Sequence, residues 1–190
     1  MPTAGVLALL LLLSAAQAAE RGSIPLGLDA YMPIPEDNPI TPKKVALGRK
    51  LFFDRRLSRD KRISCATCHD PRRAFTDGRS VAVGVFGRKG TRSAPTLVNR
   101  GYGAAFFWDG RTRSLEEQVL KPIQDPKEMD MTLEEASRRV KLSASELAAA
   151  LASYVRTILS GNAPVDRYLN GDREALSEQA RQGQIGRAHV

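Results

Sequence analysis

Cysteine and histidine are scarce in this sequence, with two of each among 190 residues. A structural zinc site takes four ligands, most often cysteine and histidine. Both cysteines and one histidine fall within the stretch SCATCHDPRRAF at residues 64–75, and no second cysteine or histidine pair exists to complete such a site. The scarcity therefore disfavours zinc and directs attention to that one stretch.

The sequence also lacks a long hydrophobic run. The apolar run at residues 6–13 is far shorter than the roughly 20 residues that span a bilayer. It is followed by Ala16-Gln17-Ala18, an A-x-A pattern typical of a secretory cleavage site, although no Lys or Arg precedes the run. We expect residues 1–18 to be a signal peptide and the mature chain to reside in the periplasm, where unmodified cysteines tend to pair.

Aromatic residues make up only 6% of the chain, and 21 acidic residues face 29 basic ones, for a net charge of +8. Nucleic-acid binding has little support, because the basic residues are dispersed, few aromatics accompany them, and export is expected. Basic residues are densest over residues 43–113. Two interpretations stay open: a surface that meets an acidic partner such as an electron-donor protein, or a solvated face with no fixed partner.

The stretch at 64–75 reads C-x-x-C-H across Cys65, Cys68 and His69. In a haem-attachment motif the two thiols bind the porphyrin and the imidazole binds the iron. A bare C-x-x-C also occurs in thioredoxin-like redox pairs, which need a βαβ context, and a small local disulfide is another alternative. Because the histidine follows the second cysteine directly, and Pro71 and Arg72 come next, we favour covalent haem c with His69 as an axial ligand.

The last six residues, IGRAHV at 185–190, show neither periodicity nor a helix cap. Followed by a stop, they can be encoded by ATC GGA AGA GCA CAC GTC TGA, which matches a widely used sequencing adapter. The adapter bases AG before this string would complete the codon of Gln184. We therefore expect residues 185–190 to be an artefact, the natural gene to continue beyond about Gln184, and His189 to be no ligand.

Local signals predict a mostly helical chain. Residues 19–40 are proline-rich and predict an extended N-terminal arm. Thr41 and Pro42 suit the cap and first position of a helix that continues to about residue 54. Residues 79–86, RSVAVGVF, could form a short strand between irregular segments.

Three Ser/Thr-x-x-Glu capping boxes, beginning at Ser114, Thr132 and Ser143, mark further helices. We expect the first to end near Pro122 and the last to end near Gly161. The predicted fold is mostly α: a class I c-type cytochrome-like haem domain with long irregular loops, at residues 41–184. In such a domain the haem itself supplies much of the apolar core.

Four stretches resemble the N-terminal half of bacterial di-haem cytochrome c peroxidases, a family that includes the MauG proteins. They read LGRKLFFDRRLSRDKRISCATCH, RSAPTLVNRGYGAAFFWDGR, SLEEQVLKPIQDPKEM and SGNAPVDRYLNGD, and the resemblance runs from about Ile40 to Gln182. Members of the family carry a second C-x-x-C-H in a C-terminal domain. The resemblance therefore implies a second haem in a missing C-terminal half, in agreement with the adapter interpretation.

The resemblance implies roles for the residues that match these motifs. Cys65 and Cys68 match the haem-attachment thiols, and His69 matches the axial ligand of the peroxidatic haem. Trp108, in FFWDGR, matches the tryptophan between the two haems, and Pro122 matches a distal-pocket proline. Without the resemblance, Trp108 would be expected to be a core aromatic.

Gln118 and Glu128, ten and twenty residues after Trp108, match the polar pair on the distal side of the haem. Peroxide reduction requires a proton to move from one oxygen to the other, which a carboxylate can do as base and then acid. Glu128 is the candidate, and the Gln118 amide can hold peroxide or water. From residue type alone both would be surface residues, but the spacing favours function. Asp109 and Arg111 are expected to form a structural ion pair.

Two positions depart from the family pattern. Many relatives have a histidine that caps the iron until the other haem is reduced. Aligned by distance to Trp108, that position is Val85, and no histidine lies nearby. We therefore expect the iron to be five-coordinate or water-bound in the all-ferric enzyme, as MauG also works without that histidine. Ser93 replaces an asparagine that usually binds calcium, and a serine hydroxyl is a poorer ligand, so calcium at Ser93 is in doubt.

The resemblance implies a periplasmic di-haem cytochrome c peroxidase that reduces hydrogen peroxide to water with electrons from a small cytochrome or copper protein. One alternative is a MauG-like oxidase that acts on a partner protein, and Val85 is compatible with both. Another is a non-catalytic electron-transfer cytochrome c. The fragment is expected to be inactive alone, because the haem at which electrons enter lies outside it, and a homodimer stays an open option.

Overall fold

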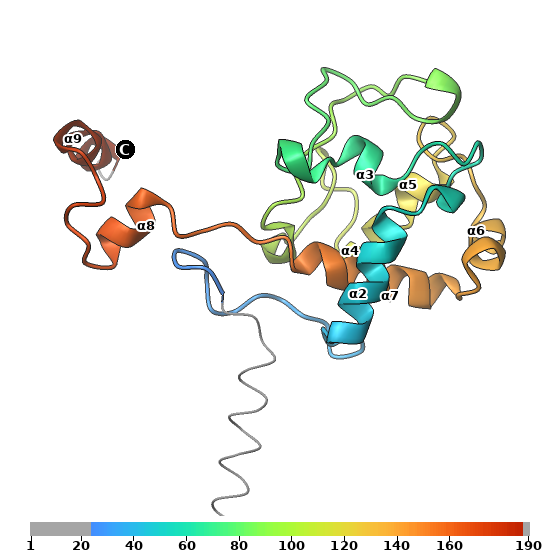
Figure 1. Cartoon of the computed structure of the whole chain (residues 1–190), viewed down its shortest axis with the longest axis horizontal. Coiled ribbons are helices and arrows are strands. Elements are labelled where there is room, and N and C mark those ends of the chain that lie inside the picture. The colour runs from blue at the N-terminus through green and yellow to red at the C-terminus, as the bar shows by residue number, and fades with distance from the viewer. Residues whose placement is uncertain (1–23, 188–190) are drawn as a thin grey trace, which may run out of the picture. The chain divides into compact units, whose positions relative to one another are not determined.

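The computed structural model describes residues 24–187, so the predicted signal peptide at 1–18 lies outside the described residues, as do residues 188–190. The chain divides into a compact unit, Met32–Ile158, and a second unit made of residues 24–31 and 159–187. The first unit contains the C-x-x-C-H stretch and the helices from α2 to α7 (Figure 1). The predicted domain at 41–184 includes residues from 159 onward, which group with the second unit, and its limits stay a prediction.

Helix α2 (Pro42–Phe52) begins where the sequence predicts. The side chain of Thr41 accepts a hydrogen bond from the Lys44 N–H at 3.2 Å. Pro42 occupies the first turn, where the N–H that proline lacks would have no helical partner. The predicted start of this helix is therefore confirmed.

Helix α7 (Ala144–Arg156) is the longest helix in the unit Met32–Ile158. Its capping box is present: the Glu146 N–H donates to the Ser143 hydroxyl at 3.2 Å, and the Ser143 N–H donates to the Glu146 carboxylate at 2.8 Å. The predicted start is confirmed, whereas the helix ends at Arg156 and not near Gly161.

Helices α2 and α7 pack against each other at Gly48. A Cβ at this position would overlap the carbonyl oxygen of Ala150 and lie 2.8 Å from the Tyr154 Cβ. Beside this contact the Phe52 and Tyr154 rings meet edge to face, with centroids 5.1 Å apart. The absence of a side chain at Gly48 thus allows the close approach around which the apolar core forms.

Three shorter helices lie between the C-x-x-C-H stretch and α7: α4 (Leu115–Gln118), α5 (Lys121–Gln124) and α6 (Leu133–Val140). The hydroxyls of Ser114 and Thr132 cap α4 and α6 by accepting from N–H groups three residues on, at 3.1 and 3.2 Å. Helix α4 stops at Gln118, earlier than the predicted end near Pro122. Pro122 lies in the first turn of α5, where a proline is tolerated.

The chain between α2 and α4 is irregular, apart from α3 (Cys65–Cys68) and four 3₁₀ turns, η1 (Arg55–Leu57), η2 (Pro71–Arg73), η3 (Val85–Gly87) and η4 (Arg100–Tyr102). The predicted strand at 79–86 is wrong: residues 24–187 contain no strand, only isolated bridges such as Val83 with Lys89. Phe86 and Gly87 have φ of 56° and 73°. The chain therefore reverses there, and pairing stops after one bridge.

The fold class is confirmed as mostly helical with long irregular connections. The second unit contains α8 (Pro164–Leu169) and α9 (Glu178–Arg187). Within it, the Asn162 N–H donates to the Leu26 carbonyl at 2.7 Å. Across residues 24–187, no helix has the length and apolar character needed to cross a membrane.

Candidate haem site

The C-x-x-C-H residues lie on a single helical turn, α3. The Ser64 N–H donates to the Thr67 hydroxyl at 3.0 Å, and the Thr67 N–H donates to the Ser64 carbonyl at 2.9 Å. The His69 N–H donates to the Cys65 carbonyl at 2.9 Å, which closes the turn. Residues three and four apart on a helix lie on the same face. Cys65, Cys68 and His69 are therefore presented together.

Both thiols are free, so the local disulfide is not formed in this structure. Burial raises the pKa of Cys65 to about 12 and that of Cys68 to about 11. Redox-active C-x-x-C pairs depend instead on a lowered thiol pKa. The environment of these cysteines therefore disfavours the thioredoxin-like alternative.

The His69 ring is held by a backbone carbonyl. Its Nδ1 lies 2.9 Å from the Phe75 carbonyl oxygen, an interaction that fixes Nδ1 as the donor and leaves Nε2 for a metal. Burial lowers the pKa of His69, although the carbonyls of Phe75 and Pro95 raise it. The imidazole is therefore kept in the neutral form that binds iron.

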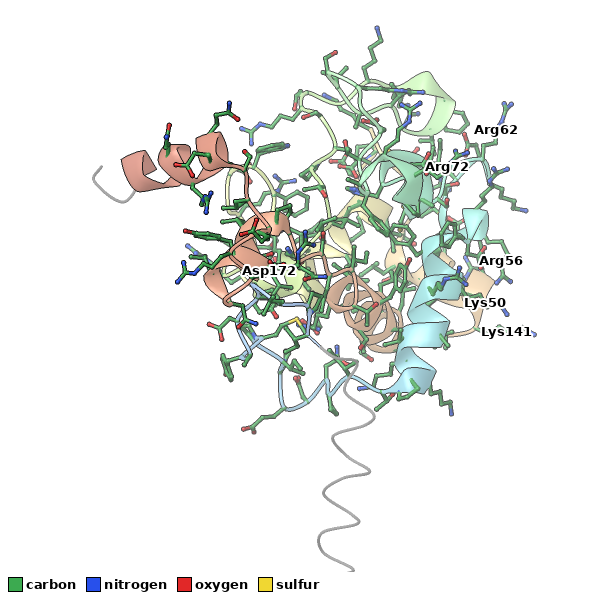
Figure 2. The ribbon with its side chains drawn as sticks, turned by 60° about the vertical axis from the view of Figure 1, so that its left-hand side comes forward. Lys50, Arg56, Arg62, Arg72, Lys141 and Asp172 are labelled. Atoms are coloured by element: carbon green, nitrogen blue, oxygen red, sulfur yellow. The ribbon has the colours of Figure 1, made fainter. Side chains whose placement is uncertain are left out.

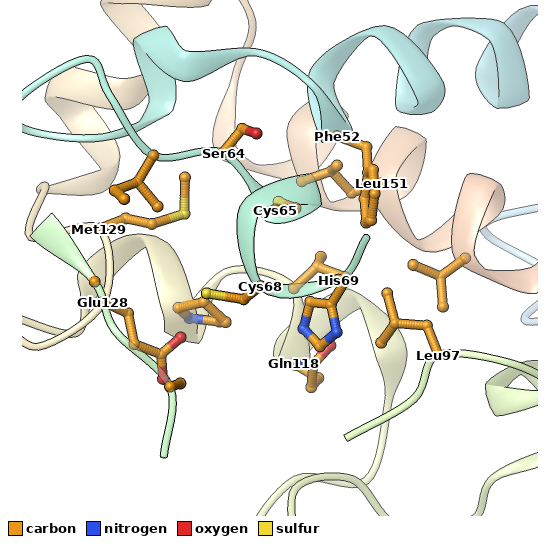
Figure 3. A pocket seen from close by; sticks show the side chains of 16 residues that line it. Phe52, Ser64, Cys65, Cys68, His69, Leu97, Gln118, Glu128, Met129 and Leu151 are labelled. Carbon is orange, nitrogen blue, oxygen red and sulfur yellow. The ribbon is translucent and has the colours of Figure 1, made fainter. Parts of the chain in front are cut away.

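A cavity lies against the α3 turn (Figure 3). Its walls are largely apolar and come from α2, α7 and the loops, with Phe52, Leu97, Leu151, Val155 and Met129 among them. Two free thiols, an available imidazole nitrogen and an apolar cavity beside them fit haem c.

A wider hollow adjoins this cavity. The two share the residues Cys68, His69, Ala82, Leu97, Gln118, Pro122 and Glu128. Trp108 and Ser93 line only the wider hollow, and Cys65 only the cavity. The structure therefore brings every predicted site residue to one continuous cleft, while the roles assigned to them stay predictions.

Glu128 is the most perturbed carboxyl group of the cleft. Its pKa is raised to about 7, chiefly by burial and further by the nearby Asp125 carboxylate, whereas Arg111 lowers it. A group that titrates near neutral pH can both accept and release a proton under ordinary conditions. The burial of Glu128 therefore gives it the property that general acid–base chemistry requires.

Gln118 enters the cleft from the end of α4, which is anchored by a buried ion pair. Arg156 donates to both oxygens of Glu116, at 2.6 and 3.1 Å, and its side chain is only 4% exposed. Asn38, from the N-terminal arm, donates to the same carboxylate at 2.6 Å. Because Glu116 precedes Gln118 by two residues, this network holds the helix that carries the amide.

Trp108 lies on a tight loop closed by an isolated bridge between Phe106 and Thr112. Its ring is 60% exposed, and its Nε1 donates to the Ser93 carbonyl at 2.9 Å. Trp108 is therefore not a buried core aromatic, the alternative that its residue type alone would favour. The carbonyl of Ser93 is engaged by the indole, and its role in calcium binding stays a prediction.

The predicted ion pair between Asp109 and Arg111 is present, at 2.9 Å. The Arg111 guanidinium also lies over the Phe107 ring, 3.5 Å from its centroid. Among residues 24–187, no group of three or more His, Cys, Asp or Glu side chains is arranged to hold a metal ion.

Sequence reasoning missed the walls of the cavity. Phe52, Leu151 and Val155 lie in helices whose starts the sequence predicts, but helical periodicity does not tell a face that meets a neighbouring helix from one that meets a cavity. Leu97 and Gly84 carried no local signal at all. Val85 is fully buried and lies outside the residues that line the cleft.

Comparison with known proteins shows the same pattern over most of the chain. The sequence profile of the family described as "Di-haem cytochrome c peroxidase" matches residues 42–145. The methylamine utilization protein MauG of Methylorubrum extorquens is 42% identical over 170 residues, which cover 80% of this chain and 48% of that protein. Cytochrome c551 peroxidase of Pseudomonas aeruginosa is 36% identical over 178 residues, covering 80% of this chain and 51% of that protein.

Solved structures of similar fold come from the same family. A crystal structure of a MauG-like protein associated with microbial copper homeostasis superposes with a TM-score of 0.72 and 34% identity, over 85% of this chain and 51% of that one. The di-haem peroxidase BthA of Burkholderia thailandensis superposes with a TM-score of 0.65 and 25% identity, over 84% of this chain and 50% of that one. The chain spans about half the length of the relatives it matches.

Proposed function

The chain belongs to the di-haem cytochrome c peroxidase family, and on that premise we propose that it is the peroxidatic domain of a periplasmic enzyme that reduces hydrogen peroxide to water. One observation carries the proposal: a single cleft joins the C-x-x-C-H turn to a half-buried carboxyl group, Glu128, whose pKa is about 7. A haem that only transfers electrons has no need of such a group beside it.

Cys65 and Cys68 would attach haem c, and the Nε2 of His69 would bind its iron. When bound, haem c supplies an iron that takes up and passes on electrons. The apolar walls and Pro122 line the cavity that would hold the haem. A second haem is expected in the portion of the family fold that this chain does not span, and for that reason we expect the fragment alone not to turn over.

Glu128 and Gln118 would carry the proton chemistry. Reduction of one peroxide to two waters consumes two electrons and two protons, and one proton must first move between the peroxide oxygens. The Glu128 carboxylate accepts that proton and, as the acid, returns it to the oxygen that leaves as water. The Gln118 amide, held by the Glu116–Arg156 anchor, orients the peroxide.

Trp108 presents an exposed indole at the mouth of the cleft. We assign it to electron transfer between this domain and the part of the enzyme that carries the second haem. Its hydrogen bond to the Ser93 carbonyl fixes the plane of the ring. Calcium near Ser93 would lie beside Trp108, where this domain is proposed to meet the part of the enzyme that carries the second haem.

The electron donor is proposed to be a small cytochrome or copper protein with an acidic surface. The unit Met32–Ile158 contains 24 basic and 15 acidic residues. Lys50, Arg56, Arg62, Arg72 and Lys141 lie along one side of this unit (Figure 2). Opposite charge on the donor would speed its encounter with this basic side.

The test is a single-turnover reaction of the haem-loaded chain with hydrogen peroxide. The reduced haem is mixed with peroxide in a stopped-flow instrument, and its oxidation is followed by absorbance. Glu128→Gln should slow the reaction by about 10²–10⁴-fold, the usual contribution of a general acid–base group. Glu134→Gln, which makes the same change on exposed α6, should react like the wild type. Equal rates for wild type and Glu128→Gln would refute the proposal, and a haem unreactive toward peroxide would favour an electron-transfer cytochrome.

One observation favours a MauG-like oxidase as a second candidate: MauG of Methylorubrum extorquens is 42% identical to the chain. The buried Val85 in place of a capping histidine is compatible with both activities. Fast turnover of the complete gene product with a reduced cytochrome would support the peroxidase. Slow turnover accompanied by oxidative modification of a partner protein would support the oxidase.

A further inference from the structure

Among residues 24–187, no group donates a hydrogen bond to the carboxyl group of Glu128. Burial is the main cause of its raised pKa, followed by the Asp125 carboxylate. Its place in the cleft therefore depends on the backbone that carries it. That backbone is the short segment 125–130, between α5 and α6.

The loop at residues 84–88 meets this segment backbone to backbone. The Val85 N–H donates to the Glu128 carbonyl at 2.8 Å. At Gly84 a Cβ would overlap the carbonyl oxygens of Lys127 and Glu128 and lie 2.6 Å from the Glu128 Cα. All three atoms belong to the backbone, so no rotation of a side chain could relieve the clash.

Arg88 ties the far end of the same loop to the same segment. Its Nη1 donates to the Pro126 carbonyl at 2.6 Å and to the Asp130 carboxylate at 3.0 Å. These two contacts lie two residues before and two residues after Glu128. Together with Val85, they hold the segment at three points.

The geometry points to a positioning role for the loop at residues 84–88: Gly84 and Arg88 clamp the backbone of Glu128 so that its carboxyl group stays inside the cleft. The inference rests on the proposed function, in which Glu128 transfers the proton. Val85 lies within the clamp, where its N–H holds the Glu128 backbone. In this inference the position has a structural role and does not supply a ligand to the iron.

Gly84→Ala tests the clamp, with Gly90→Ala as the matched control. A Cβ at Gly90 would meet its nearest atom, the Ala82 carbonyl oxygen, at an ordinary 3.5 Å. The haem-loaded chain is titrated while infrared spectroscopy follows the Glu128 carboxyl band, assigned by its absence in Glu128→Gln. In Gly84→Ala the pKa should fall from about 7 toward the ordinary value of 4.5, because the displaced carboxyl group reaches water. Gly90→Ala should titrate like the wild type.

The single-turnover reaction gives the second readout. The pH at which the rate falls on the acid side should shift downward in Gly84→Ala, in step with the infrared titration. The maximal rate should fall by about 10²-fold, as expected for a displacement of about 1 Å. A variant that is only less stable would show a lower melting temperature with an unchanged pH profile, and that result would overturn the clamp.

Arg88→Gln keeps the inference testable if Gly84→Ala does not fold. It removes the bonds to Pro126 and Asp130, whereas Lys89→Gln removes the same charge from the neighbouring residue. The infrared pKa and the acid limb should both move down in Arg88→Gln alone. Equal titrations in these two variants would overturn the clamp. An unaffected rate in Glu128→Gln would refute the proposed function but not the clamp, which the infrared pKa reports independently.

Discussion

At the scale of single residues, the site depends on burial working in opposite directions on different groups. Removal from water raises the pKa of the Glu128 carboxyl and of the Cys65 thiol but lowers that of the His69 imidazole, because burial disfavours whichever form is charged. One cause therefore produces a proton-transfer group that titrates near pH 7 and a neutral imidazole for the iron.

Glu128 should make the stability of the protein depend on pH. Its folded pKa of about 7 exceeds the ordinary value of 4.5, so the folded state binds more protons between these values and loses stability as the pH rises through them. At about 1.4 kcal/mol per pKa unit, the loss is about 3 kcal/mol. We expect the wild-type free energy of unfolding, measured with urea, to fall by that much more than that of Glu128→Gln between about pH 4 and pH 8. If the free energies of unfolding of the wild type and Glu128→Gln changed in parallel with pH, the prediction would be wrong. Glu36→Gln, on the exposed arm, controls for the loss of one negative charge.

At the scale of elements, the α2–α7 contact determines where the cavity lies. Phe52 from α2 and Leu151 and Val155 from α7 all reach its lining. The buried pair of Glu116 and Arg156 then joins α7 to α4, the helix that carries Gln118. The two longest helices of the unit thus position both an apolar wall and a polar side chain of the cleft.

Gly48→Ala should destabilise the protein although alanine favours helices. Helix propensity alone predicts a gain of about 1 kcal/mol. The added Cβ, however, would overlap the Ala150 carbonyl oxygen, and overpacking a core costs about 1–3 kcal/mol. We expect a net loss of up to about 2 kcal/mol in urea unfolding. Ala46→Gly, on the exposed side of α2, measures how much helix propensity alone changes the free energy of unfolding. If Gly48→Ala stabilised the protein, the two helices could separate without cost and the prediction would be wrong.

At the scale of the whole molecule, charge is unevenly distributed. The unit Met32–Ile158 has an excess of nine basic residues, and the rest of the chain is close to neutral. Several of the acidic residues within the unit are occupied in ion pairs, including Asp54 with Arg56 and Asp70 with Arg72. The unit is therefore net positive, and Lys50, Arg56, Arg62, Arg72 and Lys141 lie along the side shown in Figure 2.

Electron transfer from an acidic donor protein should slow as salt is added. Raising the ionic strength from about 10 to 200 mM should lower the second-order rate constant by about 10-fold, because screening shortens the reach of the attraction. The measurement is stopped-flow reduction of the complete, haem-loaded gene product by an acidic cytochrome. Arg62→Gln should lower the rate at low salt, whereas Arg173→Gln, in the second unit, should not. A rate independent of salt would favour a basic side with no fixed partner.

Several features of this protein followed from the sequence by itself, because their causes are local. A capping hydroxyl at Thr41 or Ser143 acts on N–H groups within one turn, and C-x-x-C-H needs only one turn to bring Cys65, Cys68 and His69 together. Ordered motifs likewise identified the family and the residues of the cleft. The predicted strand at 79–86 failed, since alternating apolar residues do not reveal the left-handed turn at Phe86 and Gly87.

Only the tertiary structure decided how those residues act. The pKa of Glu128 results from burial beneath segments distant in sequence, and its place results from Gly84 and Arg88, which no periodicity marks as partners. The same holds for the cavity wall at Leu97 and for the exposure of Trp108. Burial, close backbone approach and cavity shape arise from contacts between distant segments, and for that reason local sequence patterns could not predict them.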